Sequence, residues 1–151
     1  MEVNLEVNLR IATLEDVEGI IQLCNECFLE DTDVEVAKRI FKETESNPND
    51  IYVVGEVDGK IVAHAKVTII KTIYNPMGTY SILNHVCVKP DYRRHGIATK
   101  MLDYITGICL EHHCNKMELW SNNVRTAAHA CYYHYGFTLD DAGFFSKKLG
   151  V

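Results

Sequence analysis

Apolar and polar positions alternate in several stretches of the chain and recur with helical spacing in others, which predicts an order of strands and helices. Alternation, or a short apolar run, marks strands at residues 3–11, 51–57, 61–70, 79–88, 116–120 and, at the end of the chain, at Phe137 and 144–149. Helical spacing marks helices from Thr13 or the Glu15-Asp16 pair to Phe28, from 34 to about 44, from Gly96 to near His112 or His113, and from 126 to 135.

The predicted order is therefore β-α-α-β-β-β-α-β-α-β. Asp58-Gly59 has the sequence of a two-residue hairpin turn, and Gly136 stands at the C-cap position of the last helix. Repeats, low-complexity tracts and linkers are absent from the sequence, so we expect one domain over residues 1–151. This order predicts an α+β fold in which a mixed, mainly antiparallel sheet is flanked by helices.

Composition is typical of a globular protein, since 47% of the 151 residues are apolar and 24% are charged. A net charge of −6 argues against nucleic-acid binding, and no apolar run approaches the ~20 residues of a membrane span. Residues 1–4 lack the features of a signal peptide, and the spacing of the six cysteines indicates no disulfide framework. We therefore expect a cytoplasmic protein with reduced thiols. Association as a homodimer is left open by the sequence.

The segment after the predicted strand 79–88 has the features of a phosphate-binding turn. The strand ends before Pro90, a basic turn follows at residues 93–95, and Gly96 opens a helix. This order brings backbone N–H groups and the positive end of a helix to one place, where a phosphate or pyrophosphate is stabilised. The spacing differs from that of a P-loop and from that of a dinucleotide-binding loop. The plain alternative is a structural turn with a solvated basic patch.

Two motifs in this half of the chain resemble the GNAT superfamily of acetyl-CoA-dependent N-acetyltransferases. Arg93-x-x-Gly96-x-Ala98 is similar to the family's acetyl-CoA signature, Q/R-x-x-G-x-G/A. Tyr132-x-x-x-Gly136-Phe137 is similar to a second motif near the family's C-terminus. The resemblance covers about residues 79–149, while the N-terminal half matches only in the order of its elements. It implies a GNAT-like fold and acetyl-CoA as cosubstrate.

The resemblance also implies which residues bind acetyl-CoA. The strand before the turn would lie beside pantetheine and supply N–H donors to the oxyanion of acyl transfer. The turn would bind the pyrophosphate, and an asparagine after strand 116–120 would bond pantetheine, unless it is an ordinary loop residue. The residues expected to bind the cosubstrate are Val86, Cys87, Val88, Arg93, Arg94, His95, Gly96, Ile97, Ala98, Thr99 and Asn123.

Acetyl transfer to an amine also needs a proton donor for the CoA thiolate and a proton acceptor for the amine. The resemblance assigns the donor to Tyr132, for which packing on an amphipathic helix is the alternative reading. Asn84 and His85 stand where many family members have an acid, and of the two only His85 can accept a proton. Neighbours on a strand face opposite sides, so only one of this pair is expected to face the site. Other candidates for the acceptor are solvent, Glu26, Glu30 and Asp31.

Two further segments admit other chemistry. Cys24-x-x-Cys27 has the spacing of a redox pair or of half a zinc site, but no second pair accompanies it and a core role is favoured. Glu-His-His-Cys at residues 111–114 could bind a metal, although histidines also suit the C-terminal end of a helix. We expect no metal site.

The sequence thus predicts an enzyme that moves an acetyl group from acetyl-CoA to a primary amine of a small molecule or peptide, by direct attack. A CoA-binding regulatory or sensor domain on the same fold is the alternative, which the neutral Asn84 keeps open. A phosphate-binding module unrelated to CoA is a third reading. Acidic residues between 26 and 35 would attract a cationic acceptor or form an ordinary solvated loop.

Overall fold

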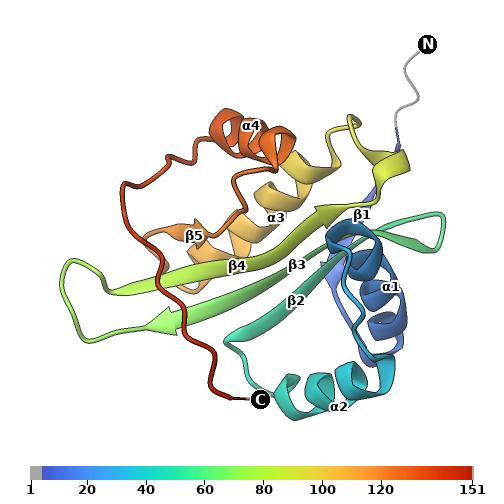
Figure 1. Ribbon diagram of the computed structural model, residues 1–151, viewed down its shortest axis with the longest axis horizontal. Coiled ribbons are helices and arrows are strands. Elements are labelled where there is room, and N and C mark those ends of the chain that lie inside the picture. The colour runs from blue at the N-terminus through green and yellow to red at the C-terminus, as the bar shows by residue number, and fades with distance from the viewer. Residues whose placement is uncertain (1–4, 151) are drawn as a thin grey trace. The chain divides into compact units, whose positions relative to one another are not determined.

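The computed structural model describes residues 5–150, and the chain divides after Trp120 into two compact units. The first unit holds the sheet and the helices α1 to α3, and the second unit holds α4 and the C-terminal segment (Figure 1). No helix in the described part of the chain is long and apolar enough to cross a membrane.

Five strands form one mixed sheet in the order β1-β2-β3-β4-β5. The first four pair antiparallel, and β5 pairs parallel to β4. Their bounds are β1 Asn8–Ile11, β2 Asp50–Val57, β3 Lys60–Lys71, β4 Thr79–Val88 and β5 Met117–Leu119. The predicted mixed, mainly antiparallel sheet is confirmed.

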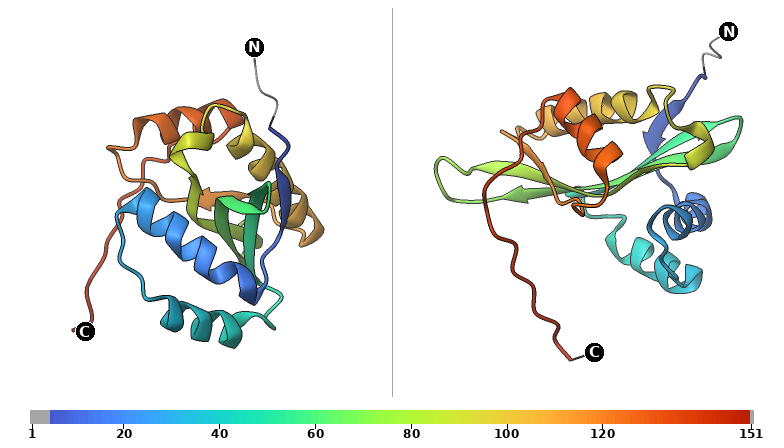
Figure 2. Two further views of the ribbon diagram at one scale, coloured as in Figure 1. Left: turned by 90° about the vertical axis from the view of Figure 1, so that its right-hand side faces the viewer. Right: turned by 45° about the horizontal axis from the view of Figure 1, so that its top comes forward.

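Helices cover both faces of this sheet. Figure 2 shows α1 (Val17–Phe28) and α2 (Val34–Thr44) on one face and α3 (Ile97–Glu111) on the other. Short 3₁₀ turns at Leu14–Asp16 and Pro90–Tyr92 precede α1 and α3. In the second unit, α4 spans Thr126–Tyr135.

Helical spacing of apolar residues explains which side of each helix is buried. On α3 the predicted stripe, with Ile97, Met101, Leu102 and Ile105, is at most 2% exposed. On α1 the buried stripe is Val17, Ile20, Leu23 and Cys24, and it packs with Val54 and Cys87 of the sheet. The buried stripes of α1 and α3 therefore form one apolar layer on each face of the sheet.

Turn chemistry fixes the β2–β3 hairpin as predicted. Asp58 and Gly59 both have left-handed backbone angles, with φ of 50° and 78°. A two-residue turn with two such residues matches the twist of the strands that it joins.

The predicted last strand is wrong. Residues 137–150 form neither helix nor strand. Phe144 and Phe145 are neighbours and would point to opposite faces of a strand, and the pair Lys147-Lys148 follows them after one serine. The segment therefore has no apolar face to bury against a sheet, and the side chain of Phe145 is 94% exposed.

The first strand is shorter than the predicted range 3–11. It begins at Asn8, and the first two residues of the predicted range, Val3 and Asn4, lie outside the described residues.

A paired arginine and carboxylate joins β1 to the start of α1. Arg10 on β1 donates from Nη1 to Asp16 Oδ2 at 2.6 Å and from Nη2 to Asp16 Oδ1 at 2.8 Å. Asp16 Oδ2 also accepts from the backbone N–H of Thr13 at 2.8 Å. These bonds, the guanidinium's foremost, lower the pKa of Asp16 from 3.8 to about 2 although burial opposes the shift.

Replacing Asp16 by Asn tests this connection. A carboxylate whose pKa is lower in the folded state stabilises the fold above its unfolded pKa and loses that effect as the pH falls toward 2. We expect Asp16→Asn to lower the free energy of unfolding by about 1–2 kcal/mol at pH 7, discounted for the partial exposure of Arg10. The difference from wild type should vanish near pH 2, as measured by urea unfolding across pH. Glu15→Gln, an exposed carboxylate on the same turn, is the control and should change little.

Candidate active site

A β-bulge interrupts β4 next to the predicted pantetheine strand. On β3 and β4, His64 pairs with Cys87 and Lys66 pairs with Asn84, so His85 and Val86 together oppose one β3 residue. His85 has a left-handed backbone with φ of 53°. Histidine and asparagine are among the non-glycine residues that adopt this conformation more readily. The Asn84-His85 pair was therefore the one sequence signal of the bulge.

The extra residue moves the rest of β4 to the opposite face of the sheet. Ser81 faces α3, where its Oγ accepts a hydrogen bond from Cys109 Sγ at 3.2 Å. Strict alternation would place Cys87 on the same face as Ser81, but Cys87 packs in the cluster formed with α1. Strict alternation, on which the expectation that Asn84 and His85 face opposite sides rests, is interrupted at this bulge, and both residues are exposed.

Beyond the bulge, one edge of β4 is open. In the part of the chain that the structure describes, β4 and β5 pair only through Ser81, Ile82 and Leu83, opposite residues 117–119. Residues 84–88 of β4 have no strand partner on that side, while Asn84, Cys87 and Val88 remain paired with β3 on the other side. The three predicted pantetheine residues, Val86 to Val88, therefore lie on a part of the strand edge that does not pair with β5.

The turn after β4 presents backbone N–H groups at the start of α3. Arg94 and Gly96 both have left-handed backbones, with φ of 66° and 77°. Residues of alternating handedness form a concave set of N–H groups that favours anions. Gly96 is the N-cap of α3 and offers no side-chain cap, and the first turn of α3 contains no acid. The N–H groups of Ile97, Ala98 and Thr99 belong to the first turn, which has no intrahelical acceptors for them.

Arg93 differs in role from its basic neighbours. Its Nε donates to Val88 O at 2.9 Å, and its Nη2 lies 3.8 Å from Cys27 Sγ on α1. The guanidinium thus connects the turn to β4 and α1, while the side chains of Arg94 and His95 are exposed.

His85 contacts one of the alternative proton acceptors named from the sequence. Its Nε2 lies 3.0 Å and 3.1 Å from the two carboxylate oxygens of Glu30. Its ring packs edge-on against Phe28, with centroids 5.0 Å apart. The loop that carries Glu30 is held by Asn25, whose side chain bonds the backbone N–H of Thr32 at 3.0 Å. Sequence reasoning named both residues but gave no sign that they meet.

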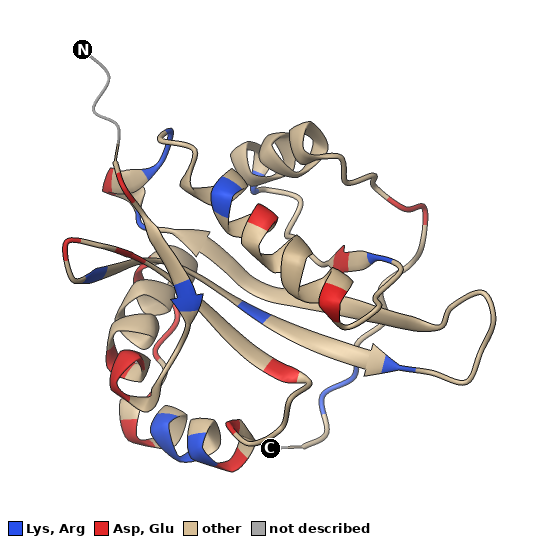
Figure 3. Ribbon diagram, turned by 180° about the vertical axis from the view of Figure 1, so that it is seen from behind, with Lys and Arg blue, Asp and Glu red and all other residues tan. Residues whose placement is uncertain are grey.

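Three of the other acids of this region have internal partners. Glu26 bonds Lys89 at 2.9 Å, Asp33 caps α2 by accepting from two backbone N–H groups, and Glu35 pairs with Lys38 at 3.6 Å. Figure 3 shows acidic and basic residues interspersed on α2. This arrangement is typical of a solvated face rather than of a surface built to collect cations.

In the second unit, the Tyr132 motif forms the C-terminal cap of α4. The N–H of Phe137 donates to Tyr132 O at 2.9 Å, and Gly136, with a φ of 113°, donates to Tyr133 O at 3.1 Å. The rings of Tyr132 and Phe137 meet edge-on with centroids 5.8 Å apart. These are the bonds and the apolar contact of a Schellman motif. The spacing of this motif therefore fixes the position of the Tyr132 ring on its helix.

Asn122 and Asn123 differ in the loop before α4. Asn122 Oδ1 accepts from the N–H of Val124 at 3.1 Å and so belongs to the turn itself. Asn123, the residue predicted to bond pantetheine, is exposed.

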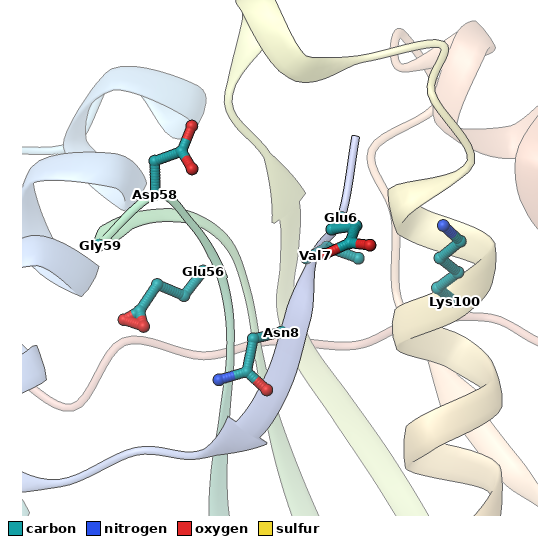
Figure 4. A pocket seen from close by; sticks show the side chains of 7 residues that line it. All are labelled: Glu6, Val7, Asn8, Glu56, Asp58, Gly59 and Lys100. Carbon is teal, nitrogen blue, oxygen red and sulfur yellow. The ribbon is translucent and has the colours of Figure 1, made fainter. Parts of the chain in front are cut away.

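A hollow among the described residues lies away from the predicted site. It has a volume of about 560 Å³ and lies against β1 and the β2–β3 hairpin, with Lys100 alone contributed by α3 (Figure 4). Its lining residues are Glu6, Val7, Asn8, Glu56, Asp58, Gly59 and Lys100. Among the residues described, no group of three or more His, Cys, Asp or Glu side chains is arranged to hold a metal ion.

The family model of the acetyltransferase (GNAT) family matches residues 17–137. The chain belongs to this family. The match begins at the first residue of α1 and ends at Phe137, so it includes both GNAT motifs and confirms the resemblance seen in the sequence. A comparison with curated proteins finds no match.

Solved structures with the same fold match nearly the whole of this chain. Glucosamine-6-phosphate N-acetyltransferase from Arabidopsis thaliana is 21% identical with a TM-score of 0.81, over 94% of this chain and 98% of that one. A predicted acetyltransferase from Clostridium acetobutylicum, solved with acetyl-CoA, is 22% identical with a TM-score of 0.77, over 94% and 96%. A transcriptional regulator from Bacillus halodurans C-125 is 20% identical with a TM-score of 0.86, over 95% and 100%. At these identities the likeness concerns the fold.

Proposed function

We propose that this GNAT chain transfers an acetyl group from acetyl-CoA to a primary amine. The observation that carries the proposal is the order of three structural features along the segment from β4 to the start of α3. A bulge at His85, an unpaired strand edge at residues 86–88 and an uncapped helix start at Gly96 follow one another directly. A thioester, an amide-containing arm and a pyrophosphate follow one another in the same order in acetyl-CoA.

The residues of this segment fit those parts of the cosubstrate. The edge of β4 offers backbone groups to the amides of pantetheine. The N–H groups of the turn and of the first residues of α3 suit a pyrophosphate, because the helix end is positive and lacks a competing carboxylate. An added Cβ at Gly96 would meet no atom within 4 Å, so the space beside its backbone is open. The exposed Arg94 and His95 add donors at the rim.

In the reaction, the amine attacks the thioester carbonyl and a tetrahedral oxyanion forms before the C–S bond breaks. We assign stabilisation of this oxyanion to the backbone at Val86, where the bulge takes the strand out of its regular ladder. Tyr132 then protonates the CoA thiolate. This assignment rests on the spacing of its motif, and the Schellman cap supports it only by fixing the ring's position on α4.

His85 is the proposed proton acceptor for the amine, with Glu30 as its partner. When the Nε2–H donates to the Glu30 carboxylate, Nδ1 is the basic nitrogen of the neutral imidazole. The carboxylate also stabilises the imidazolium that forms after proton transfer. Both groups are on the surface, where an amine can reach them.

A non-catalytic, CoA-binding regulatory domain is the second candidate. The observation that favours it is that the transcriptional regulator from Bacillus halodurans C-125 has the same fold. The two candidates share the cosubstrate site and differ only in turnover.

We further propose that residues 1–151 act as one N-acetyltransferase domain in the cytoplasm. The family match extends across both compact units, and all six cysteines are free thiols, as expected in a reducing compartment. A homodimer stays a prediction.

Gly96→Glu tests the pyrophosphate site. Acetyl-CoA in large excess over its Kd should raise the melting temperature by several degrees, because a ligand that binds the folded state stabilises it. A glutamate at Gly96 places negative charge where the phosphates would bind and should abolish this shift. Gly59→Glu is a matched control, since Gly59 has a φ of 78° and the same open surroundings. An equal shift in both folded variants would contradict the proposed site.

His85→Asn tests the proton acceptor, because asparagine tolerates the left-handed backbone of the bulge. The rate at neutral pH should fall by ~10²-fold, in the range of one general base. The deficit should shrink as the pH approaches ~10, where a lysine-like amine loses its proton unaided. Asn84→Ala is the control and should keep near-full activity. A deficit that is equal at every pH would show that His85 acts in another way.

Tyr132→Phe tests the proton donor. The substitution keeps the ring contact with Phe137 and removes only the hydroxyl, so acetyl-CoA should still stabilise the protein. We expect kcat to fall by ~10²–10⁴-fold, while Tyr133→Phe and Tyr135→Phe stay close to wild type. Near-full kcat in Tyr132→Phe, with chemistry limiting, would refute the assignment. Normal acetyl-CoA binding with no turnover across a panel of amines, even in wild type, would favour the regulatory domain.

A further inference from the structure

Three thiols meet where the end of α1 packs against β4. Cys24 and Cys27 lie one turn apart on α1, and the bulge turns Cys87 of β4 toward them. Cys24 and Cys87 belong to one buried cluster, and Cys27 packs against that cluster. Cys24 and Cys87 are only 4% and 3% exposed, whereas Cys27 is half-buried and reaches solvent. The cluster therefore combines one accessible thiol with two protected ones.

The surroundings of Cys27 favour its thiolate. Arg93 Nη2 lies 3.8 Å from the sulfur, and the hydrogen bond with Cys87 and the charge of Arg93 hold the pKa of Cys27 well below its ordinary value. Burial, the nearby Glu26 carboxylate and the C-terminal end of α1 oppose this effect. In the protonated state, Cys27 instead donates to Val88 O at 3.6 Å.

The other thiols lack this environment. Hydrogen bonds to Cys24 and Cys27, together with burial, raise the pKa of Cys87. Burial also raises the pKa values of Cys109, Cys114 and Cys131. Reactive cysteines are partly exposed thiolates next to a cation, and Cys27 meets both conditions.

We propose that Cys27 and Cys87 are a peroxide-sensitive thiol pair whose oxidation joins α1 to β4 by a disulfide. In the first step, the Cys27 thiolate attacks hydrogen peroxide: an S–O bond forms, the O–O bond breaks, and the released hydroxide takes a proton to become water. In the second step, the Cys87 thiol attacks the sulfur of the Cys27 sulfenic acid: the S–S bond forms, the S–O bond breaks, and the leaving hydroxide takes the Cys87 proton to become a second water. Two thiols are oxidised and one peroxide is reduced. Cys24 does not start the reaction, because peroxide does not reach it.

This proposal does not depend on acetyl transfer, since it is read from the thiols themselves. If the proposed function also holds, the disulfide would anchor the strand that lies beside pantetheine.

Peptide mapping of the full-length protein tests the pair. The reduced protein is exposed to hydrogen peroxide, its remaining thiols are blocked with N-ethylmaleimide, and it is digested with trypsin without reduction. Cys24 and Cys27 fall in the peptide 11–38 and Cys87 falls in the peptide 72–93. We expect these two peptides to be linked in wild type and in Cys24→Ala, and to be separate in Cys27→Ser. In Cys87→Ala, dimedone should trap a sulfenic acid on Cys27.

Two outcomes would overturn the proposal. One is the absence of a link in folded wild-type protein, and the other is a link that persists in Cys27→Ser and is lost in Cys24→Ala.

A rate measurement that needs no substitution completes the test. Iodoacetamide at neutral pH should modify Cys27 about tenfold faster than Cys114, which is also half-buried. Equal rates would show that Cys27 is an ordinary thiol. Arg93→Gln should slow the reaction of Cys27, whereas Arg94→Gln should not.

Discussion

One additional residue in β4 determines the geometry on which the rest of the proposed site depends. Side chains alternate along a strand, so a single inserted residue exchanges the faces of everything that follows it. Before the bulge, β4 packs against α3 through Ser81, and after it β4 packs against α1 through Cys87. The same irregularity exposes His85 toward Glu30. The open edge, His85 and Cys87 all lie within a few residues of it.

Most of the fold could be predicted because local signals and tertiary packing agree. The helices 34–44 and 126–135 and the strand 79–88 have the predicted bounds, since caps, turns and apolar periodicity mark the same residues. The last predicted strand failed for the converse reason. Its phenylalanines suggested a strand, but adjacent apolar residues and a lysine pair cannot form one buried face.

Individual residues of the candidate site could be named from the sequence, but the contacts between them could not. Gly96 and Arg94 could be named because a basic, glycine-containing turn between a strand and a helix has a recognisable sequence. The bulge has no glycine, and the rule of alternation does not hold across it. The meeting of His85 with Glu30, 55 residues apart in sequence, depends on how α1 packs on the sheet. Such a contact is a property of the packing and leaves no local pattern.

The bond from Arg93 to Val88 explains a feature of the family signature that charge alone does not. The signature admits glutamine as well as arginine at this position, although only arginine is a cation. In this structure, Arg93 donates a nitrogen-bound proton to a strand carbonyl 2.9 Å away. A glutamine side chain also ends in an N–H donor. Selection at this position would then act on a hydrogen-bond donor that fastens the turn to the strand, and the anion would be held mainly by peptide dipoles that no substitution of a side chain can remove.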